Sequence, residues 1–185
     1  MLAAAVSCDG PADPAHVAYV QVSPGTWDPT ALGDTVQFTA VAQSGLHRTI
    51  PDLPVTWSSD APSIVFVGTD GSAVANEDGI AQVRATIDGV TGTAAVSVVQ
   101  RIESVEILTY FGNTVAVGDS IWLYVDARDR NFHSVPGATF MLQSLNPSLA
   151  TITPSGWVRG VGTGEANIVA TAAGKADTAL VQVHP

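Results

Sequence analysis

The side chains that could carry out chemistry in this chain are few and far apart. The four histidines are His16, His47, His133 and His184, and no pair has the spacing of a helical zinc motif. The sequence contains no Gly-x-Ser-x-Gly nucleophile motif and no phosphate-binding loop followed by a lysine. These patterns predict no catalytic residues and no cofactor, and they favour a protein that is not an enzyme.

Two runs of acidic residues could in principle bind calcium. Residues 76–78 and 126–129 each carry two carboxylates, but neither run has EF-hand spacing, and Arg128 and Arg130 add positive charge to the second. Calcium takes about six to eight oxygen ligands. We therefore interpret these acids as turn residues of an acidic protein, and no metal site is predicted.

The composition favours β-structure and argues against polyanionic partners. The 185 residues are 46% hydrophobic and only 13% charged, with 7 Lys and Arg against 17 Asp and Glu. The excess of Val, Ala, Thr and Gly favours strands over helices. A net charge of −10 repels phosphate groups, so no nucleic-acid partner is expected. With one cysteine, no intramolecular disulfide is possible, and the fold must be held by packing.

The single cysteine, Cys8, lies in a sequence that resembles a bacterial lipobox. Small residues precede it (Ala5-Val6-Ser7), although the position three residues before it is Ala5 rather than the usual Leu. This pattern predicts that residues 1–8 are the remnant of a lipoprotein-type signal, that Cys8 is lipidated, and that residues 9–17 are a tether. Such an anchor places the protein in the periplasm or at the cell surface. The alternative is a secreted chain with a stray thiol in its leader.

The stretch from residue 55 to residue 98 predicts antiparallel strands. Apolar and polar residues alternate over residues 81–87 and 94–98, and Asp-Gly pairs at residues 70–71, 78–79 and 88–89 mark tight turns. Each sheet needs an apolar cover, so the strands are expected to close into a sandwich. Residues 44–52 are expected to form a loop.

The sequence repeats itself after about 85 residues without a gap. Val20 corresponds to Val105, Gly71 to Gly156, and other turn glycines and inward-facing residues match in the same way. Most outward-facing residues do not match, as expected for two copies of one sandwich. The repeat predicts an all-β protein with two tandem immunoglobulin-like β-sandwiches, at residues 18–100 and 101–185.

Motifs of the first copy resemble the bacterial Ig-like domain, group 2. They are Val55-x-Trp57-Ser58-Ser59, Pro62-Ser63-Ile64-Val65, Gly79-Ile80-Ala81 and the closing Ala94-Ala95-Val96-Ser97-Val98. The second copy lacks the Trp and keeps Asn146-Pro147-Ser148 and Gly164-Glu165-Ala166. The resemblance implies Ig-like sandwiches that serve as spacers, adhesin modules, or protein- or carbohydrate-binding appendages on cell surfaces. The core motif itself selects none of these roles.

The most informative difference between the two copies is in the positions of their aromatic residues. Gln37 and Thr39 of the first copy correspond to Trp122 and Tyr124, which are expected to point outward from the second sandwich. The predicted protein-binding residues are Trp122, Tyr124, Tyr110, Phe111, Trp157 and Met141. A solvated sheet face does not need such rings, and exposed aromatic patches mark interfaces. The alternatives are that the rings pack on the protein itself, or that they stack on a carbohydrate.

The sequence therefore predicts a non-catalytic, lipid-anchored, two-domain protein. Its predicted partner is another protein, such as a larger membrane complex on which this chain is an accessory or scaffolding subunit. The alternative is a cell-surface adhesin or a polysaccharide-binding module.

Overall fold

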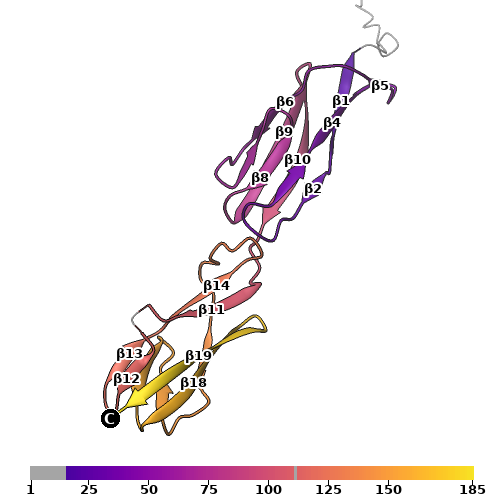
Figure 1. Cartoon of the computed structure of the whole chain (residues 1–185). Coiled ribbons are helices and arrows are strands. Elements are labelled where there is room, and N and C mark those ends of the chain that lie inside the picture. The colour runs from indigo at the N-terminus through magenta and orange to yellow at the C-terminus, as the bar shows by residue number, and fades with distance from the viewer. Residues whose placement is uncertain (1–15, 111) are drawn as a thin grey trace, which may run out of the picture. The chain divides into compact units, whose positions relative to one another are not determined.

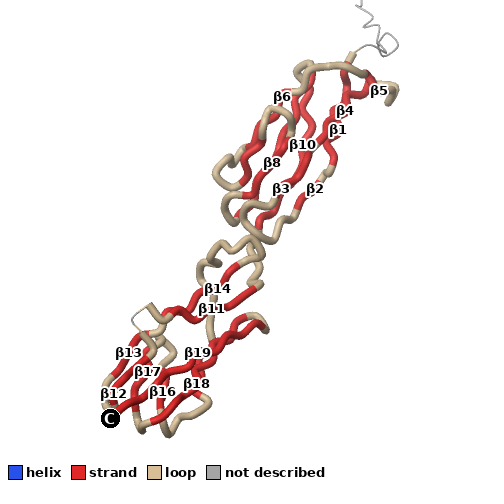
Figure 2. Tube along the Cα trace, in the orientation of Figure 1, coloured by secondary structure: helices blue, strands red, loops and turns tan. Residues whose placement is uncertain are grey.

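The computed structural model describes residues 16–110 and 112–185, and these residues form strands and loops without a helix (Figures 1 and 2). The predictions for Cys8, for Phe111 and for most of the tether fall on positions outside the described residues. Val17, expected to end the tether, is the first residue of a strand and is buried. All-β structure, as predicted, follows from the alternation of apolar and polar residues.

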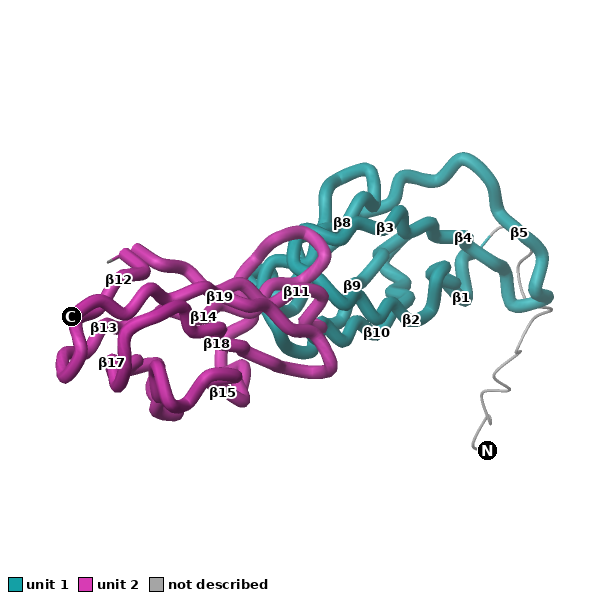
Figure 3. Tube along the Cα trace, turned by 60° about the horizontal axis from the view of Figure 1, so that its bottom comes forward, with its two compact units in different colours: residues 1–99 teal, residues 100–185 magenta. Residues whose placement is uncertain are grey.

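The chain divides into two compact units, residues 1–99 and 100–185 (Figure 3). The boundary lies between Val99 and Gln100, one residue before the boundary expected from the sequence repeat.

Unit 1 is a sandwich of two layers of mostly antiparallel strands. Its strands are β1 (Val17–Ser23), β2 (Thr26–Trp27), β3 (Thr35–Gln37), β4 (Thr39–Ser44), β5 (Thr49–Ile50), β6 (Thr56–Ser59), β7 (Val65–Val67), β8 (Ser72–Ala75), β9 (Gly79–Ile87) and β10 (Val90–Val98). One layer contains the ladders β1-β4-β5 and β3-β8-β7, which join because β3 and β4 are one strand interrupted at Phe38. The other layer is β2-β10-β9-β6, in which β2 runs parallel to β10.

Unit 2 has the same topology, except that no strand among its described residues corresponds to β5. Its strands are β11 (Ser104–Leu108), β12 (Thr114–Ala116), β13 (Ser120–Trp122), β14 (Tyr124–Arg128), β15 (Met141–Ser144), β16 (Ala150–Ile152), β17 (Trp157–Gly160), β18 (Gly164–Ala172) and β19 (Lys175–His184). One layer contains β11-β14 and β13-β17-β16, and the other is β12-β19-β18-β15. This order of strands is that of an immunoglobulin-like sandwich, so the predicted fold of two tandem sandwiches is confirmed.

The 85-residue repeat holds at the level of single hydrogen bonds. The amide of Phe38 donates to the carbonyl of Gly71 at 2.9 Å, and in unit 2 the amide of Leu123 donates to Gly156 at the same distance. Both glycines have positive φ, 82° and 89°. A Cβ added to Gly71 would lie 2.5 Å from the carbonyl oxygen of Phe38, and one added to Gly156 would lie 2.6 Å from that of Leu123. Only glycine fits there without displacing backbone, which is why the sequence repeats it.

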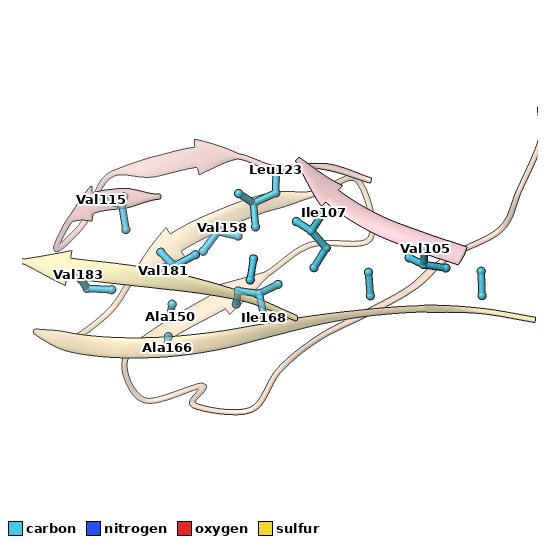
Figure 4. Close-up of a cluster of buried hydrophobic side chains, with 13 residues drawn as sticks. Val105, Ile107, Val115, Leu123, Ala150, Val158, Ala166, Ile168, Val181 and Val183 are labelled. Carbon is cyan, nitrogen blue, oxygen red and sulfur yellow. The ribbon is translucent and has the colours of Figure 1, made fainter. Parts of the chain in front are cut away.

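The two cores differ in kind. In unit 1, the buried Phe38 lies between Trp27 and Trp57, with ring centroids 6.2 and 6.3 Å away. In unit 2, the buried side chains are aliphatic and point into the space between the two layers (Figure 4). Leu123 and Leu142 occupy the positions of Phe38 and Trp57 in the second copy. Unit 2 therefore builds the same sandwich with smaller side chains at these two positions, while Phe140, the counterpart of Val55, packs against its core.

One prediction about the connections was wrong. Residues 44–52 were expected to form a loop, but β5 lies within them and pairs with β4 through Ala42↔Ile50 and Gln43↔Thr49. A strand of two residues is too short to show any alternation, and it exists because the end of β4 offers it a partner.

The loop after β14 is organised by Asp129, whose side chain is fully buried. Its Oδ1 accepts hydrogen bonds from the backbone amides of Asn131 and His133, at 2.9 and 3.0 Å. Its Oδ2 accepts from Nε2 of Gln100 at 2.9 Å, and Gln100 also donates to the carbonyl of Ser134. The first residue of unit 2 is thereby attached to this loop.

Asp129→Asn is expected to lower the free energy of unfolding of unit 2 by about 1–2 kcal/mol. The amide retains one acceptor for the two backbone donors, but it loses the charge and presents an NH₂ group toward Gln100. Hydrogen exchange followed by mass spectrometry on peptides of unit 2 measures this change. Asp119→Asn is the control, because Asp119 is exposed, and it should change stability by less than about 0.5 kcal/mol. Equal effects of the two substitutions would contradict the role given to Asp129.

Candidate binding face of the second unit

Trp122 and Trp157 lie directly opposite each other on neighbouring strands. β13 pairs with β17 in the register Ser120↔Arg159, Ile121↔Val158 and Trp122↔Trp157. Opposite residues of an antiparallel pair project from the same face of the sheet. Val158 is fully buried, so the two tryptophans project from the other, outer face, and 51% of Trp157 is exposed.

Tyr124 and Tyr110 extend this group of rings. The centroid of Tyr124 lies 5.7 Å from that of Trp122 and 6.3 Å from that of Tyr110. Tyr124 is 38% exposed and Tyr110 is 72% exposed. We call Tyr110, Trp122, Tyr124 and Trp157 the aromatic face. The fold thus brings together four of the six residues that the sequence singled out.

Trp122 is held in place by a hydrogen bond that unit 1 also makes. Its Nε1 donates to the carbonyl of Ser155 at 2.9 Å. At the matching position of unit 1, Nε2 of Gln37 donates to the carbonyl of Asp70 at 2.7 Å. The indole of Trp122 is half-buried and reaches over Gly156. Part of this ring therefore packs on the protein itself, which was the alternative weighed from the sequence, while the other rings remain more open to solvent.

Two depressions are lined by residues of the aromatic face, and a third adjoins one of them. The first, of about 370 Å³, is lined by Ser120, Ile121, Trp122 and Trp157. The second, of about 470 Å³, lies between Trp122 and Tyr124 on one side and Phe140, Leu142 and Pro154 on the other. The third, of about 600 Å³, shares Thr139, Phe140, Leu142 and Pro154 with the second and includes Met141, which is 70% exposed. We call the second and third depressions the groove, and Met141 lies in the part of the groove that no residue of the aromatic face lines.

We attribute the groove to the different sequence positions at which the two units carry their large rings. In unit 1, the indole of Trp57 lies against Gly71 from strand β6. The matching residue of unit 2 is Leu142, and an indole edge lies against Gly156 from strand β13 instead, through Trp122. Compared with unit 1, unit 2 lacks three core rings, gains the four rings of the aromatic face, and carries Phe140 beside its core where unit 1 has Val55. The lost rings are Trp27, Phe38 and Trp57, whose counterparts are Gly112, Leu123 and Leu142.

Arg159 is a member of this face that was missed from the sequence. It follows Trp157 by two residues on β17, with the buried Val158 between them, so both side chains project outward. Arg159 is exposed and makes no side-chain hydrogen bond or ion pair with any other described residue. The i, i+2 spacing was readable from the sequence, but its position opposite Ser120 and beside Trp122 required the strand register.

The titratable groups of the described residues show no arrangement for catalysis. The pKa of Asp70 is lowered by hydrogen bonds from the hydroxyl and amide of Ser72, and the pKa of Glu103 is lowered by its hydrogen bond and ion pair with Lys175. Both carboxylates lie at the surface. In the described part of the chain, no group of three or more His, Cys, Asp or Glu side chains converges as a metal site would require.

In the acidic run at residues 126–129, both carboxylates accept hydrogen bonds from protein donors. Asp126 accepts from the Ser134 hydroxyl and from Nε of Arg128, while Asp129 accepts the amide hydrogen bonds of its own loop. These hydrogen bonds account for both carboxylates within β14 and the loop that follows it.

Within residues 16–110 and 112–185, no helix has the length and apolarity to cross a membrane.

No protein-family model and no curated protein sequence matches this chain. Among solved structures, domains 4 and 5 of the S-layer protein SbsC are 20% identical with a TM-score of 0.44, over 92% of this chain and 100% of that one. The Escherichia coli adhesin FdeC is 20% identical with a TM-score of 0.49, over 94% of this chain and 65% of that one. The Yersinia pseudotuberculosis adhesin InvE is 14% identical with a TM-score of 0.41, over 90% and 58%.

The chain spans only 28% of the longer SbsC structures. At these identities and scores, the fold assignment rests on the strand pairing within this chain, and no activity or partner is carried over from these proteins.

Proposed function

We propose that this protein is a non-catalytic binding module that attaches to another protein through the aromatic face of unit 2. The observation that carries the proposal is the contrast between two copies of one fold. The outer face of β3 and β8 in unit 1 carries Gln37 and Ser72, while the same positions of unit 2 carry Trp122 and Trp157. Rings at the surface add nothing to a core, and interfaces are enriched in Trp and Tyr.

The proposal includes an anchor and a location. Cys8 is the acylated residue of a lipoprotein, and residues 9–16 tether the sandwiches to a membrane, so that the protein acts in the periplasm or at the cell surface. The pattern Ala5-Val6-Ser7-Cys8 supports this part. The two sandwiches belong, in this proposal, to the group 2 bacterial Ig-like domains, and the partner is a larger membrane complex to which the chain is an accessory or scaffolding subunit.

The test is co-purification from native membranes in mild detergent, with quantitative mass spectrometry of the partners and of the Cys8 peptide. The key variant replaces Trp122→Gln, Tyr124→Thr and Trp157→Ser together. Each new residue is the one that unit 1 carries at that position, and Gln can retain the hydrogen bond to the Ser155 carbonyl as Gln37 does to Asp70. We expect recovery of the partner to fall about tenfold or more, as for the loss of an interface hot spot.

The control is Phe66→Thr. Phe66 is a 55% exposed ring on the corresponding face of unit 1, and Thr151 is its counterpart in unit 2. This variant should retain the partner at the level of the unmodified chain. Equal recovery with the triple variant would refute docking through the aromatic face. A Cys8 peptide without acyl chains would refute the anchor and leave the docking proposal standing.

A second function, an adhesin or a polysaccharide-binding module, is favoured by the stacking surface that Trp157 presents, because exposed rings also stack on sugars. Recovery of the chain without a protein partner, together with a glycan-array signal that the triple variant loses, would support this second function instead.

A further inference from the structure

A cationic side chain, Arg159, projects from the same sheet face as the two tryptophans that line the first depression. The lining of this depression is almost entirely carbon, from the two rings and from Ile121 and Ser120. Arg159 lies opposite Ser120 in the strand register and projects from the same face as Trp157. The site therefore offers an apolar slot for a side chain and, next to it, a guanidinium group.

Arg159 forms no ion pair within residues 16–110 and 112–185. Arg84 is paired with Asp60, Arg128 with Glu106 and Asp126, and Lys175 with Glu103. Arg159 has no such pair among the described residues, in a chain where acids outnumber Lys and Arg by 17 to 7. A guanidinium group binds a carboxylate through two parallel hydrogen bonds, and a neighbouring apolar surface that excludes water strengthens them.

We propose that the segment that docks on this face is a protein segment with an aromatic or large aliphatic side chain next to an Asp or Glu. This inference rests on the proposed function and specifies its partner. The ring enters the slot between Trp122 and Trp157, and the carboxylate pairs with Arg159. A sugar would bring hydroxyl groups into a slot that has almost no polar lining, and those hydroxyls would lose their hydrogen bonds to water. A single cation also fits one carboxylate better than a polyanion, which the net charge of −10 repels.

The test uses the whole chain as bait for a library of random peptides displayed on phage. We expect the enriched peptides to carry an aromatic or large aliphatic residue within two positions of an acid. Synthetic copies of these peptides should bind Arg159→Gln about tenfold more weakly than the unmodified chain, corresponding to one charge-assisted contact. Their affinity should fall as salt is added. Arg101→Gln is the matched control, because Arg101 is also exposed in unit 2 but lies before β11, and it should leave the affinity unchanged.

Several outcomes would overturn the inference. They are enriched peptides without acids, acid-containing peptides that bind Arg159→Gln undiminished, and a library that yields no peptides. If the peptides ignore Arg159→Gln but are lost with Trp157→Ser, the docking function survives and only the carboxylate is wrong. Binding of oligogalacturonate that depends on Arg159, without peptide binding, would assign the site to acidic glycans and refute a protein occupant. Because Arg159 is exposed, an unchanged circular dichroism spectrum is expected for Arg159→Gln and checks that it folds.

Discussion

Replacing Phe38 with alanine is expected to lower the free energy of unfolding of unit 1 by about 3–5 kcal/mol, the usual cost of removing a buried phenyl ring. Phe38 is 1% exposed and is the ring between Trp27 and Trp57. Its removal would leave a cavity between two indoles that cannot both move inward. Hydrogen exchange of unit 1 peptides, read by mass spectrometry, measures the loss without assuming that the whole chain unfolds in one step.

Phe66→Ala is the matched control for this prediction. It removes the same ring from the same unit, but Phe66 is 55% exposed. Its effect should stay below about 1 kcal/mol. Similar losses for Phe38→Ala and Phe66→Ala would mean that the stack of Trp27, Phe38 and Trp57 is not the centre of this core.

Gly156→Ala is expected to lower the free energy of unfolding of unit 2 by roughly 2–5 kcal/mol. Gly156 has φ of +89°, and a Cβ would lie 2.6 Å from the carbonyl oxygen of Leu123. That oxygen belongs to the backbone at the interruption between β13 and β14, so it cannot move without disturbing both strands. The same substitution would displace the indole of Trp122, because Nε1 lies 3.2 Å from the added carbon.

Gly174→Ala is the control that separates the steric clash at Gly156 from the cost of placing alanine at positive φ. Gly174 also has positive φ, +78°, but a Cβ there would meet no atom within 4 Å. Its cost should be only about 1 kcal/mol, from placing alanine in a left-handed conformation. If the two glycine variants were equally stable, the close approach at Gly156 would not be a constraint on the fold. Urea unfolding, followed by hydrogen exchange of unit 2 peptides, compares them.

Much of the fold could be predicted from the sequence, because its determinants are local. The alternation over residues 81–87 fixes which side chains face the core, and the hairpin at Asp88-Gly89 needs two residues with positive φ. Because the sequence repeats after 85 residues, the same strands are predicted for unit 2, where Ala173-Gly174 makes the equivalent turn. The strand β5 was missed because two residues carry no periodicity.

The candidate site was less predictable, because it depends on what neighbouring strands leave empty. The differences between the two copies predict the surface rings and the replacement of Trp57 by Leu142. They do not predict whether the space that Trp57 fills in unit 1 collapses in unit 2 or remains open as a groove, because that depends on how Phe140 and Pro154 pack beside it. Nor could it place Arg159 next to the tryptophans, which are brought together only by the pairing of β13 with β17.

The most direct measurement is photo-cross-linking in the native host cells, with p-benzoylphenylalanine in place of Trp157 or, in a second strain, in place of Phe66. The account predicts one discrete cross-linked partner from position 157 and none from position 66, although both positions are exposed on the same face of the same fold. A partner captured equally from both positions, or from position 66 alone, would contradict the claim that unit 2 carries the binding face.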